Sequence, residues 1–383
     1  MWRYYLVLSK KKKIVQKKKD SQPFHTIGKP NMSGTILKNQ LKVHILGAGA
    51  IGSLVAHDLK QKFPTLIKPI LLLKQESLVE PSLNHPINVT RLDDDNQEFI
   101  SKVEVQGVKP QHFKDTIENL IVTTKSYQTL PAIRPYLSHI LPNTNILFLQ
   151  NGMGVTNTLI NKYWSDQARP NIYEGITTHG VYVNNGIVHH VGRGQIALST
   201  YPGKSNVNDF PALIQCILDT PNLNANHYEY PKFLLMQLEK LIVNCCVNPF
   251  TALFDCRNGE LLYGNNLTFT WKRIINEAKH VFVKEYTILN TIPDADSFLN
   301  TDRLLKSVVD VCKITAKNSS SMRQDVRNLR NTEIQNLNGY ISFLGRKLKV
   351  GTPVNDMVTN MILSKINIDR GIDRQAADSL SKL

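Results

Sequence analysis

A glycine-rich turn between an apolar strand and a helix is the feature that most constrains how this chain can fold. Residues 42–46 form a β-branched, apolar run, which predicts a buried strand. The motif GAGAIG follows at residues 47–52, and the apolar spacing over residues 53–62 predicts a helix. A strand, a glycine turn and a helix in this order are typical of dinucleotide binding, whereas the same motif in isolation says little.

Each glycine of the motif has a physical reason in such a turn. Gly47 permits the tight bend, Gly49 lets a pyrophosphate approach the backbone, and Gly52 lets the helix pack closely on the sheet. The free N–H groups and the dipole of the helix N-terminus then favour the phosphates. The alternative is a tight turn that binds no ligand. The residues expected to contact a cofactor here are Gly47, Gly49, Ala50, Ile51 and Gly52.

Later apolar segments continue an α/β pattern. Strands are predicted at residues 69–73, 120–124 and 146–149, and Lys125 and Asn151 lie just beyond the last two. Ligands of doubly wound sheets bind outside the carboxyl ends of the strands. Lys125 and Asn151 are therefore expected to face the cofactor crevice. The intervening residues 78–112 look irregular and polar.

Lys74 stands at the end of the second predicted strand, where NAD enzymes usually carry an acidic residue for the ribose hydroxyls. A cation at this position can pair with a 2′-phosphate. Lys74 therefore favours NADP over NAD, and the alternative is an ordinary surface lysine.

The pattern changes near residue 210. Shorter strands are predicted between residues 172 and 199, with a hairpin turn at 184–186, and they would complete the sheet. Beyond residue 210 the pattern is helical and strand signals vanish. We therefore expect an α/β chain in which a Rossmann-type doubly wound sheet precedes an all-helical C-terminal domain. The expected divisions are a basic, disordered extension at 1–40, a dinucleotide-binding domain at 41–208, a helical substrate domain at 209–368 and a C-terminal tail at 369–383.

One predicted helix carries a polar row on an apolar background. The spacing over residues 231–248 predicts a helix, and Lys240, Asn244 and Asn248 fall at i, i+4 and i+8, on one face. Asparagine is a poor helix former, so two asparagines four residues apart indicate a role other than helix formation. The row is either a solvated face or part of a site.

A second helix is predicted over residues 322–348, and Glu333 interrupts its apolar stripe. An unpaired buried carboxylate is costly, so Glu333 is expected to pair with a cation in the cleft between the domains. Ser321 precedes this helix with Gln324 three residues on, which is typical of a capping box. Ser321 could instead bind a substrate carboxylate.

Composition excludes several classes of protein. Five cysteines in 383 residues, without a CxxC pair or a histidine at zinc spacing, predict reduced thiols and no metal site. No apolar run reaches the roughly 18–20 residues of a membrane helix. The formal net charge is +15, but residues 1–40 hold nine lysines and Arg3 against Asp20 alone. The folded part is therefore only mildly basic, and nucleic-acid binding by it is not expected.

The basic N-terminal segment has three interpretations. It could be a nuclear or nucleic-acid patch, a mitochondrial presequence or a dispensable extension before Met32. Presequences favour arginine and serine, and this segment has a single arginine. We expect a cytoplasmic protein, with a mitochondrial location if the extension is real.

Six segments together resemble the ketopantoate reductase (2-dehydropantoate 2-reductase) family. The similarity runs from about Lys42 to about Asp356, and the last two of these segments are highly specific. The resemblance implies a Rossmann-type domain followed by a helical domain with the site between them. It also implies NADPH-dependent reduction of 2-dehydropantoate to (R)-pantoate, a step toward pantothenate. The segments are LGAGAIG, VTTKSYQ, QNGMG, ITTHGV with HHVGRG, EKLIVNCCVNPFTALFDCRNGEL and SSMRQDVRNLRNTEIQNLNG.

The resemblance also assigns roles to particular residues. For the reduction of a ketone, Lys240 would stabilise the developing alkoxide and deliver the proton, and a nearby Glu333 carboxylate would keep Lys240 charged despite burial. The resemblance instead favours a hydrogen bond between Glu333 and the substrate hydroxyl. Ser321 would hold the substrate carboxylate. Lys74 matches a position that is often arginine in the family. The remaining expected contacts are substrate binding by Asn151, Asn244 and Asn248, and cofactor binding by Lys125 and Asn151.

Two other functions stay open from the sequence. The same machinery would serve an NADP-dependent reductase of another branched 2-keto acid. A non-catalytic binding protein could use this fold with its basic tail on nucleic acid, although such a protein has no need of Lys240, Ser321 and Glu333 together. A homodimer is possible.

Overall fold

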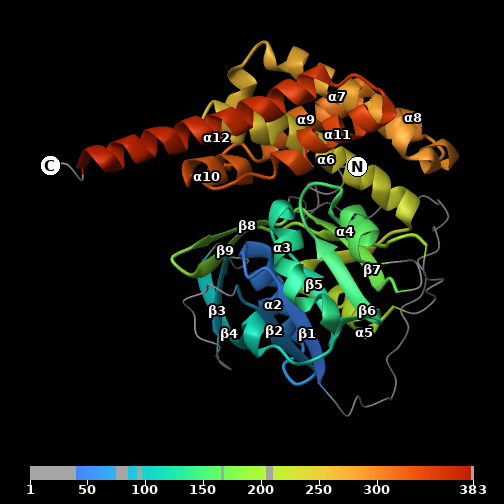
Figure 1. Cartoon of the computed structure of the whole chain (residues 1–383), viewed down its shortest axis with the longest axis vertical. Coiled ribbons are helices and arrows are strands. Elements are labelled where there is room, and N and C mark those ends of the chain that lie inside the picture. Colours follow the sequence, from blue (N-terminus) through green and yellow to red (C-terminus); the bar gives the residue numbers. More distant parts are fainter. Residues whose placement is uncertain (1–39, 75–84, 93–96, 165–167, 204–209, 381–383) are drawn as a thin grey trace, which may run out of the picture.

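The computed structural model describes residues 40–74, 85–92, 97–164, 168–203 and 210–380. One mixed sheet of eleven strands, flanked by helices, is followed by a separate helical layer (Figure 1). The predicted Rossmann-type α/β sheet followed by an all-helical domain is thus confirmed. The expected basic extension lies, but for Gln40, outside the described residues. The strands run in the order β11-β10-β7-β6-β5-β1-β2-β4-β3-β9-β8.

The centre of the sheet is parallel and buried on both faces. Ile45 belongs to the core on one face and its neighbour Leu46 to the core on the other, as expected for a strand covered on both sides. Because the strands are parallel, their carboxyl ends meet at one edge. The strands predicted at residues 42–46, 69–73, 120–124 and 146–149 are present, as is the first of the shorter strands predicted between residues 172 and 199. They are β1 (Leu41–Leu46), β2 (Ile67–Leu72), β5 (Ile117–Val122), β6 (Ile140–Leu149) and β7 (Asn171–Thr177).

The glycine turn joins β1 to α2 (Ala50–Lys62) in close contact with the neighbouring strand end. Gly47 has a φ of +116°, and a Cβ there would lie 2.6 Å from the amide nitrogen of Thr124. A Cβ at Gly52 would lie 1.9 Å from the carbonyl oxygen of Gly47. Both positions therefore need glycine for the fold itself.

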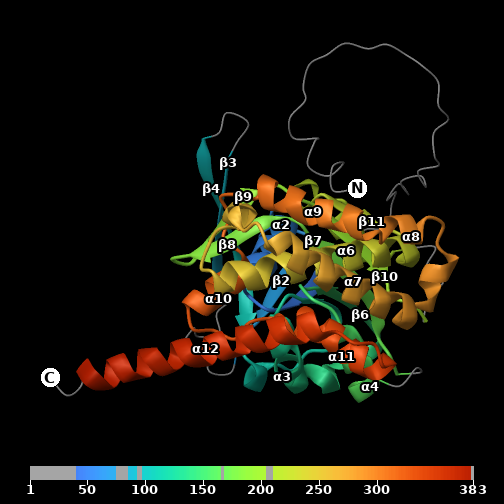
Figure 2. The same cartoon turned by 90° about the horizontal axis from the view of Figure 1, so that it is seen from above.

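The expectation that residues 78–112 are irregular is wrong for the described residues 85–92 and 97–108. β3 (His85–Leu92) and β4 (Glu98–Val108) form an antiparallel ladder, and Figure 2 shows this hairpin projecting from the body. Much of β4 is exposed, so its sequence lacks the apolar run of a buried strand. The predicted hairpin of β8 (Gly180–Asn184) and β9 (Ile187–Gly192) is confirmed.

The sheet continues past residue 208, although no strand was expected there. β11 (Ala225–His227) pairs with β10 (Ile196–Thr200), and α5 (Ala212–Leu218) packs into the core of the sheet. A three-residue strand is too short to leave a periodic signal. We propose that the boundary between the domains lies near residue 229.

The helical domain surrounds α6 (Tyr230–Leu253), which extends the helix predicted at residues 231–248 beyond Pro249. Most of the residues of α6 are buried, and eleven of them belong to the C-terminal core. Helices α3 (Thr129–Ile133) and α4 (Val155–Tyr163) belong to the sheet domain. The helical domain also contains α7 (Leu267–Glu285), α8 (Ala295–Phe298), α9 (Thr301–Ile314), α10 (Ser321–Arg327), α11 (Asn338–Leu348) and α12 (Pro353–Leu380).

The single helix predicted over residues 322–348 is also wrong. The chain leaves α10 at Leu329, whose φ of +53° is left-handed, and then forms the short 3-10 turn η7 (Ile334–Asn336) before α11. Arg370 holds this break, since its guanidinium donates to the carbonyl oxygen of Leu329 at 2.8 and 3.0 Å.

Arg370 stands on α12, within the segment that was expected to be a tail. That segment is helical as far as Leu380, and Figure 1 shows α12 running outward past the body of the domain. A salt bridge between Lys365 and Asp369, one turn apart, supports the helix there.

Gly47 and Gly49 should respond differently to the same added methyl group. The variant Gly47→Ala should lower the melting temperature by several degrees, because its Cβ meets the backbone of Thr124 at a positive φ. In Gly49→Ala, no atom lies within 4 Å of the added Cβ, so the melting temperature should stay within about 1 °C of the parent. Calorimetry of both variants tests this, and equal destabilisation would contradict it.

Candidate active site

A cavity of about 1120 Å³ lies where the carboxyl ends of the parallel strands face the helical domain. The glycine turn and the residues after β2, β5 and β6 form one wall, and two residues of the helical domain complete it. Among the residues predicted for the site, Gly52, Lys240, Asn244 and Asn248 are not part of this wall. Those that line it are Gly47, Gly49, Ala50, Ile51, Lys74, Lys125, Asn151, Ser321 and Glu333.

The backbone at Gly49 is open toward this cavity. No atom lies within 4 Å of the position that a Cβ would take, and Gly49 is the residue that precedes α2. The turn therefore leaves room for a phosphate group in front of the helix N-terminus, as a bound dinucleotide requires. Lys74 lines the same cavity with an exposed side chain.

Glu333 reaches from the helical domain to the sheet domain. Its Oε1 accepts from the backbone N–H of Ser126 at 3.0 Å and from the Ser126 hydroxyl at 3.1 Å. Its Oε2 lies 3.6 Å from the Nζ of Lys125. The side chain is buried, and the predicted pairing with a cation in the cleft between the domains is confirmed.

Lys125 also pairs with Asp325, at 2.9 Å. Burial alone would lower the pKa of Lys125, but the carboxylates of Glu333 and Asp325 outweigh it and raise the pKa above its ordinary value. Burial raises the pKa of Asp325, and Lys125 opposes that effect. Sequence reasoning missed Ser126 and Asp325, although Ser126 follows Lys125 directly and Asp325 lies one helical turn after Ser321.

Lys240 lies beside the wall of this cavity. Its Nζ donates to the carbonyl oxygen of Thr177 at 2.8 Å, and Thr177 lines the cavity at the end of β7. Burial lowers the pKa of Lys240 to about 8, while the Glu333 carboxylate opposes the shift. The amine therefore remains mostly protonated at neutral pH and can still give up its proton.

Asn244 and Asn248 follow Lys240 on the same face of α6 and are half-buried. Within the described part of the chain no hydrogen bond engages either side-chain amide, so both remain available to a ligand. The alternative of a fully solvated face does not describe this row.

The predicted capping box at Ser321 is wrong by one residue. Ser320 is the N-cap of α10, and its hydroxyl accepts from the backbone N–H of Arg323 at 3.0 Å. Ser321 is therefore the first residue of the helix and is not engaged in capping. It lines the cavity instead.

The loop after β6 bridges the two domains. The N–H of Met153 donates to the carbonyl oxygen of Asn336 at 3.0 Å, and the Asn336 amide donates back to the Met153 carbonyl oxygen at 3.1 Å. A Cβ at Gly152, whose φ is +78°, would lie 2.6 Å from the same Asn336 carbonyl oxygen. This close docking holds Asn151 at the cavity.

Two further observations concern metals and membranes. The described residues contain no group of three histidine, cysteine, aspartate or glutamate side chains placed to hold a metal ion. None of the described helices is both long enough and apolar enough to span a bilayer.

Comparison with known proteins places this arrangement in a family. The family model "Ketopantoate reductase PanE/ApbA" matches residues 43–203, and the model of its C-terminal part matches residues 232–365. The "Probable 2-dehydropantoate 2-reductase" of Schizosaccharomyces pombe is 35% identical over 341 residues, which cover 86% of this chain and 97% of that protein.

A more distant relative and a solved structure are also similar to this chain. The "Cytochrome B translational activator CBS2" of Saccharomyces cerevisiae is 24% identical over 85% of this chain and 95% of that protein. A solved structure of D-mandelate dehydrogenase with NADH and anilino(oxo)acetate has a TM-score of 0.68. It is 22% identical and covers 85% of this chain and 99% of that one, so it supports the fold alone. The family models and the fission yeast relative carry the assignment, and the chain belongs to the ketopantoate reductase family.

Proposed function

We propose that this chain reduces 2-dehydropantoate to (R)-pantoate with NADPH, as a step of pantothenate biosynthesis. The observation that carries the proposal is the position of Lys240, whose ammonium group lies beside the wall of a cavity shared by the glycine turn and Glu333. The name of the Schizosaccharomyces pombe relative supports the substrate.

The glycine turn and two lysines would hold the cofactor. Gly49 and the first residues of α2 would receive the pyrophosphate, and Lys74 would pair with the 2′-phosphate. Bound NADPH would supply the hydride for the substrate ketone carbon. Lys125 and Asn151 would contact the part of the cofactor that reaches the carboxyl ends of β5 and β6.

Lys240 would act on the ketone oxygen. Negative charge develops there during reduction, and an ammonium group both stabilises that charge and delivers the proton. A pKa of about 8 suits this role, because the amine is protonated before the reaction and acidic enough to transfer its proton.

The remaining polar side chains would orient the substrate. Ser321 would bind its carboxylate, and Glu333 would accept from its hydroxyl group. Asn151, Asn244 and Asn248 would donate or accept further hydrogen bonds. Reduction requires the reacting atoms in near-contact geometry, so these contacts would act mainly on kcat.

Substrate profiling tests the proposal directly. NADPH oxidation by the full chain should be at least about tenfold more efficient, in kcat/KM, with 2-dehydropantoate than with phenylglyoxylate or 2-ketoisovalerate. A preference for another branched 2-keto acid would contradict the substrate, and no oxidation with any of them would contradict an enzyme.

Lys240→Ala should lower kcat by about 100-fold or more, because it removes the proton donor and the charge beside the ketone oxygen. The NADPH dissociation constant should change less than about threefold. Lys232→Ala, an exposed lysine on the same helix, is the matched control and should keep parental kinetics. Parental turnover in Lys240→Ala would remove the role given to this amine.

The rate should also depend on pH through Lys240. Its protonated form is the active one in reduction, so kcat should be level below about pH 7 and fall as the pH rises through about 8. Lys240→Arg, which stays charged, should lose this decline along with most of its activity. A kcat that stays level up to pH 10 in the parent enzyme would contradict the lowered pKa.

Lys74→Ala should reduce the preference for NADPH over NADH, expressed as the ratio of kcat/KM values, by about tenfold, because a charge-assisted contact to the 2′-phosphate is lost. The exposed Lys62 at the end of α2 is the control, and Lys62→Ala should keep the parental ratio. An unchanged ratio in Lys74→Ala would exclude Lys74 from this contact.

A further inference from the structure

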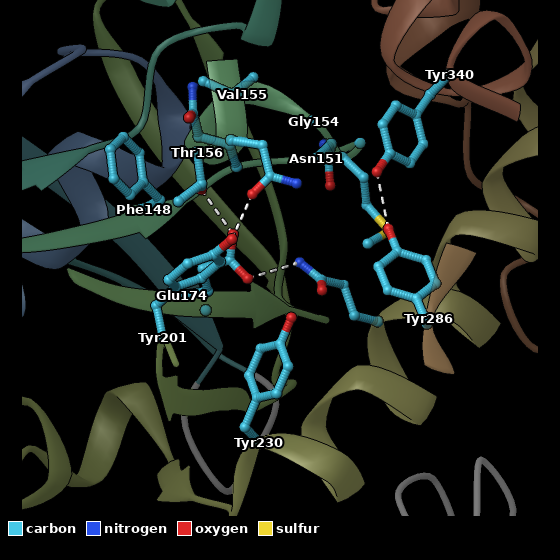
Figure 3. A pocket seen from close by; sticks show the side chains of 16 residues that line it. Phe148, Asn151, Gly154, Val155, Thr156, Glu174, Tyr201, Tyr230, Tyr286 and Tyr340 are labelled. Atoms are coloured by element: carbon cyan, nitrogen blue, oxygen red, sulfur yellow. Dashed lines mark hydrogen bonds between the residues drawn. The ribbon is translucent and has the colours of Figure 1, made fainter. Parts of the chain in front are cut away.

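A second cavity, of about 180 Å³, lies between the two domains beside the loop at residues 151–154 (Figure 3). Of the described residues, only Gln150 and Asn151 line both this cavity and the larger one. The wall combines the end of β6, the start of α4 and β7 with residues of the helical domain. Apart from Asn151, none of the residues given a role in the reductase lines this cavity.

Glu174 on β7 places its carboxylate at the centre of this cavity, as Figure 3 shows. One oxygen accepts from the Thr156 hydroxyl at 2.6 Å, and the other receives the Gln237 amide only at 3.5 Å. Among the described residues that line the cavity there is no lysine, arginine or histidine. Burial raises the pKa of Glu174 above its ordinary value, and the hydrogen bonds from Thr156 and Gln237 oppose this shift. Within the described lining the carboxylate therefore has hydrogen-bond donors but no counter-charge.

A second polar group of the wall has no hydrogen-bond partner among the described residues. The side chain of Gln237 is 9% exposed, and its carbonyl oxygen Oε1 is buried without a hydrogen bond. Figure 3 shows the hydroxyl of Tyr230 directed into the same space, toward Glu174. The cavity therefore presents acceptors that the protein itself does not satisfy, which is costly unless a ligand or water supplies donors.

Aromatic side chains form much of the remaining wall. Tyr201 and Tyr230 lie near Glu174, with their ring centroids 6.0 Å apart. The hydroxyls of Tyr286 and Tyr340 bond each other at 2.8 Å and line the side formed by the helical domain. Tyrosine rings attract cations through their faces, so both the rings and the acceptors favour a positively charged occupant.

We propose that this cavity binds a small primary alkylammonium ion. Its N–H groups would donate to the Glu174 carboxylate, to Oε1 of Gln237 and to the Tyr230 hydroxyl, and its alkyl part would lie among the tyrosine rings. A cavity of about 150 Å³ accommodates benzene, so a ligand of roughly six heavy atoms fits here. The proposal does not depend on the reductase activity.

Thermal denaturation of the full chain, without cofactor or keto acid, measures this binding. The probes are methylammonium, propylammonium and tetramethylammonium chlorides, with sodium chloride at matched ionic strength and 1-propanol as the neutral analogue. Propylammonium should raise the melting temperature saturably by about 1–3 °C, because it binds the folded state alone. Sodium chloride and 1-propanol should give no saturable shift, and tetramethylammonium, which has no N–H donor, should give a smaller one.

Variants assign the binding to this cavity. Glu174→Gln keeps a partner for Thr156 but removes the charge, and should weaken propylammonium binding at least about tenfold in calorimetric titration. Glu118→Gln removes a surface carboxylate of β5 and should bind as the parent does. Tyr230→Phe, which loses one acceptor, should weaken binding about threefold and serves if Glu174→Gln fails to fold.

Three results would overturn the proposal. They are the absence of a saturable shift with both primary ammonium ions, an equal shift with 1-propanol, and undiminished binding in Glu174→Gln or, where that variant does not fold, in Tyr230→Phe. If sodium chloride were the only probe that raised the melting temperature saturably, the occupant would be an inorganic cation, and the alkylammonium ion would be excluded. NADPH oxidation is assayed separately, so failure of this proposal and failure of the reductase assignment are distinguishable.

Discussion

The contact of Glu333 with the loop after β5 is the interaction on which the geometry of the cleft depends. One carboxylate oxygen accepts two hydrogen bonds from Ser126, and the other faces Lys125. The sheet domain thereby contributes donors and a cation, and the helical domain contributes the charge that they neutralise. A buried carboxylate without these partners would be expensive, so the contact fixes how the two domains meet.

The same carboxylate influences a second amine. Glu333 helps to raise the pKa of Lys125 and opposes the fall that burial imposes on Lys240. Lys125 has Asp325 as an additional partner. Among the described residues, the amine of Lys240 donates only to the carbonyl oxygen of Thr177. Two lysines near one glutamate therefore differ in acidity because their surroundings differ. This division lets one of them remain a fixed charge while the other can exchange its proton.

Elements whose burial leaves a periodic pattern of apolar residues could be predicted from the sequence. Features that depend on contacts between residues far apart in the sequence could not. The parallel strands and the glycine turn were predictable, since apolar runs and steric requirements are local. The hairpin of β3 and β4 was missed because only two of the eleven residues of β4 are buried. The break at Leu329 was missed because its hydrogen-bonding partner, Arg370, lies 41 residues further on. The cost of burying its carboxylate predicted that Glu333 pairs with a cation. The sequence did not show that this cation is Lys125.

The hydrogen bonds of Arg370 to the chain before Glu333 connect α12 to the cleft between the domains. α12 crosses the outside of the helical domain, yet one of its side chains bonds the carbonyl oxygen of Leu329 and the side-chain oxygen of Asn331. Glu333 lies two residues beyond that second contact. Proteolytic trimming that removes Arg370 would therefore free the backbone at Leu329, four residues before the carboxylate that joins the two domains.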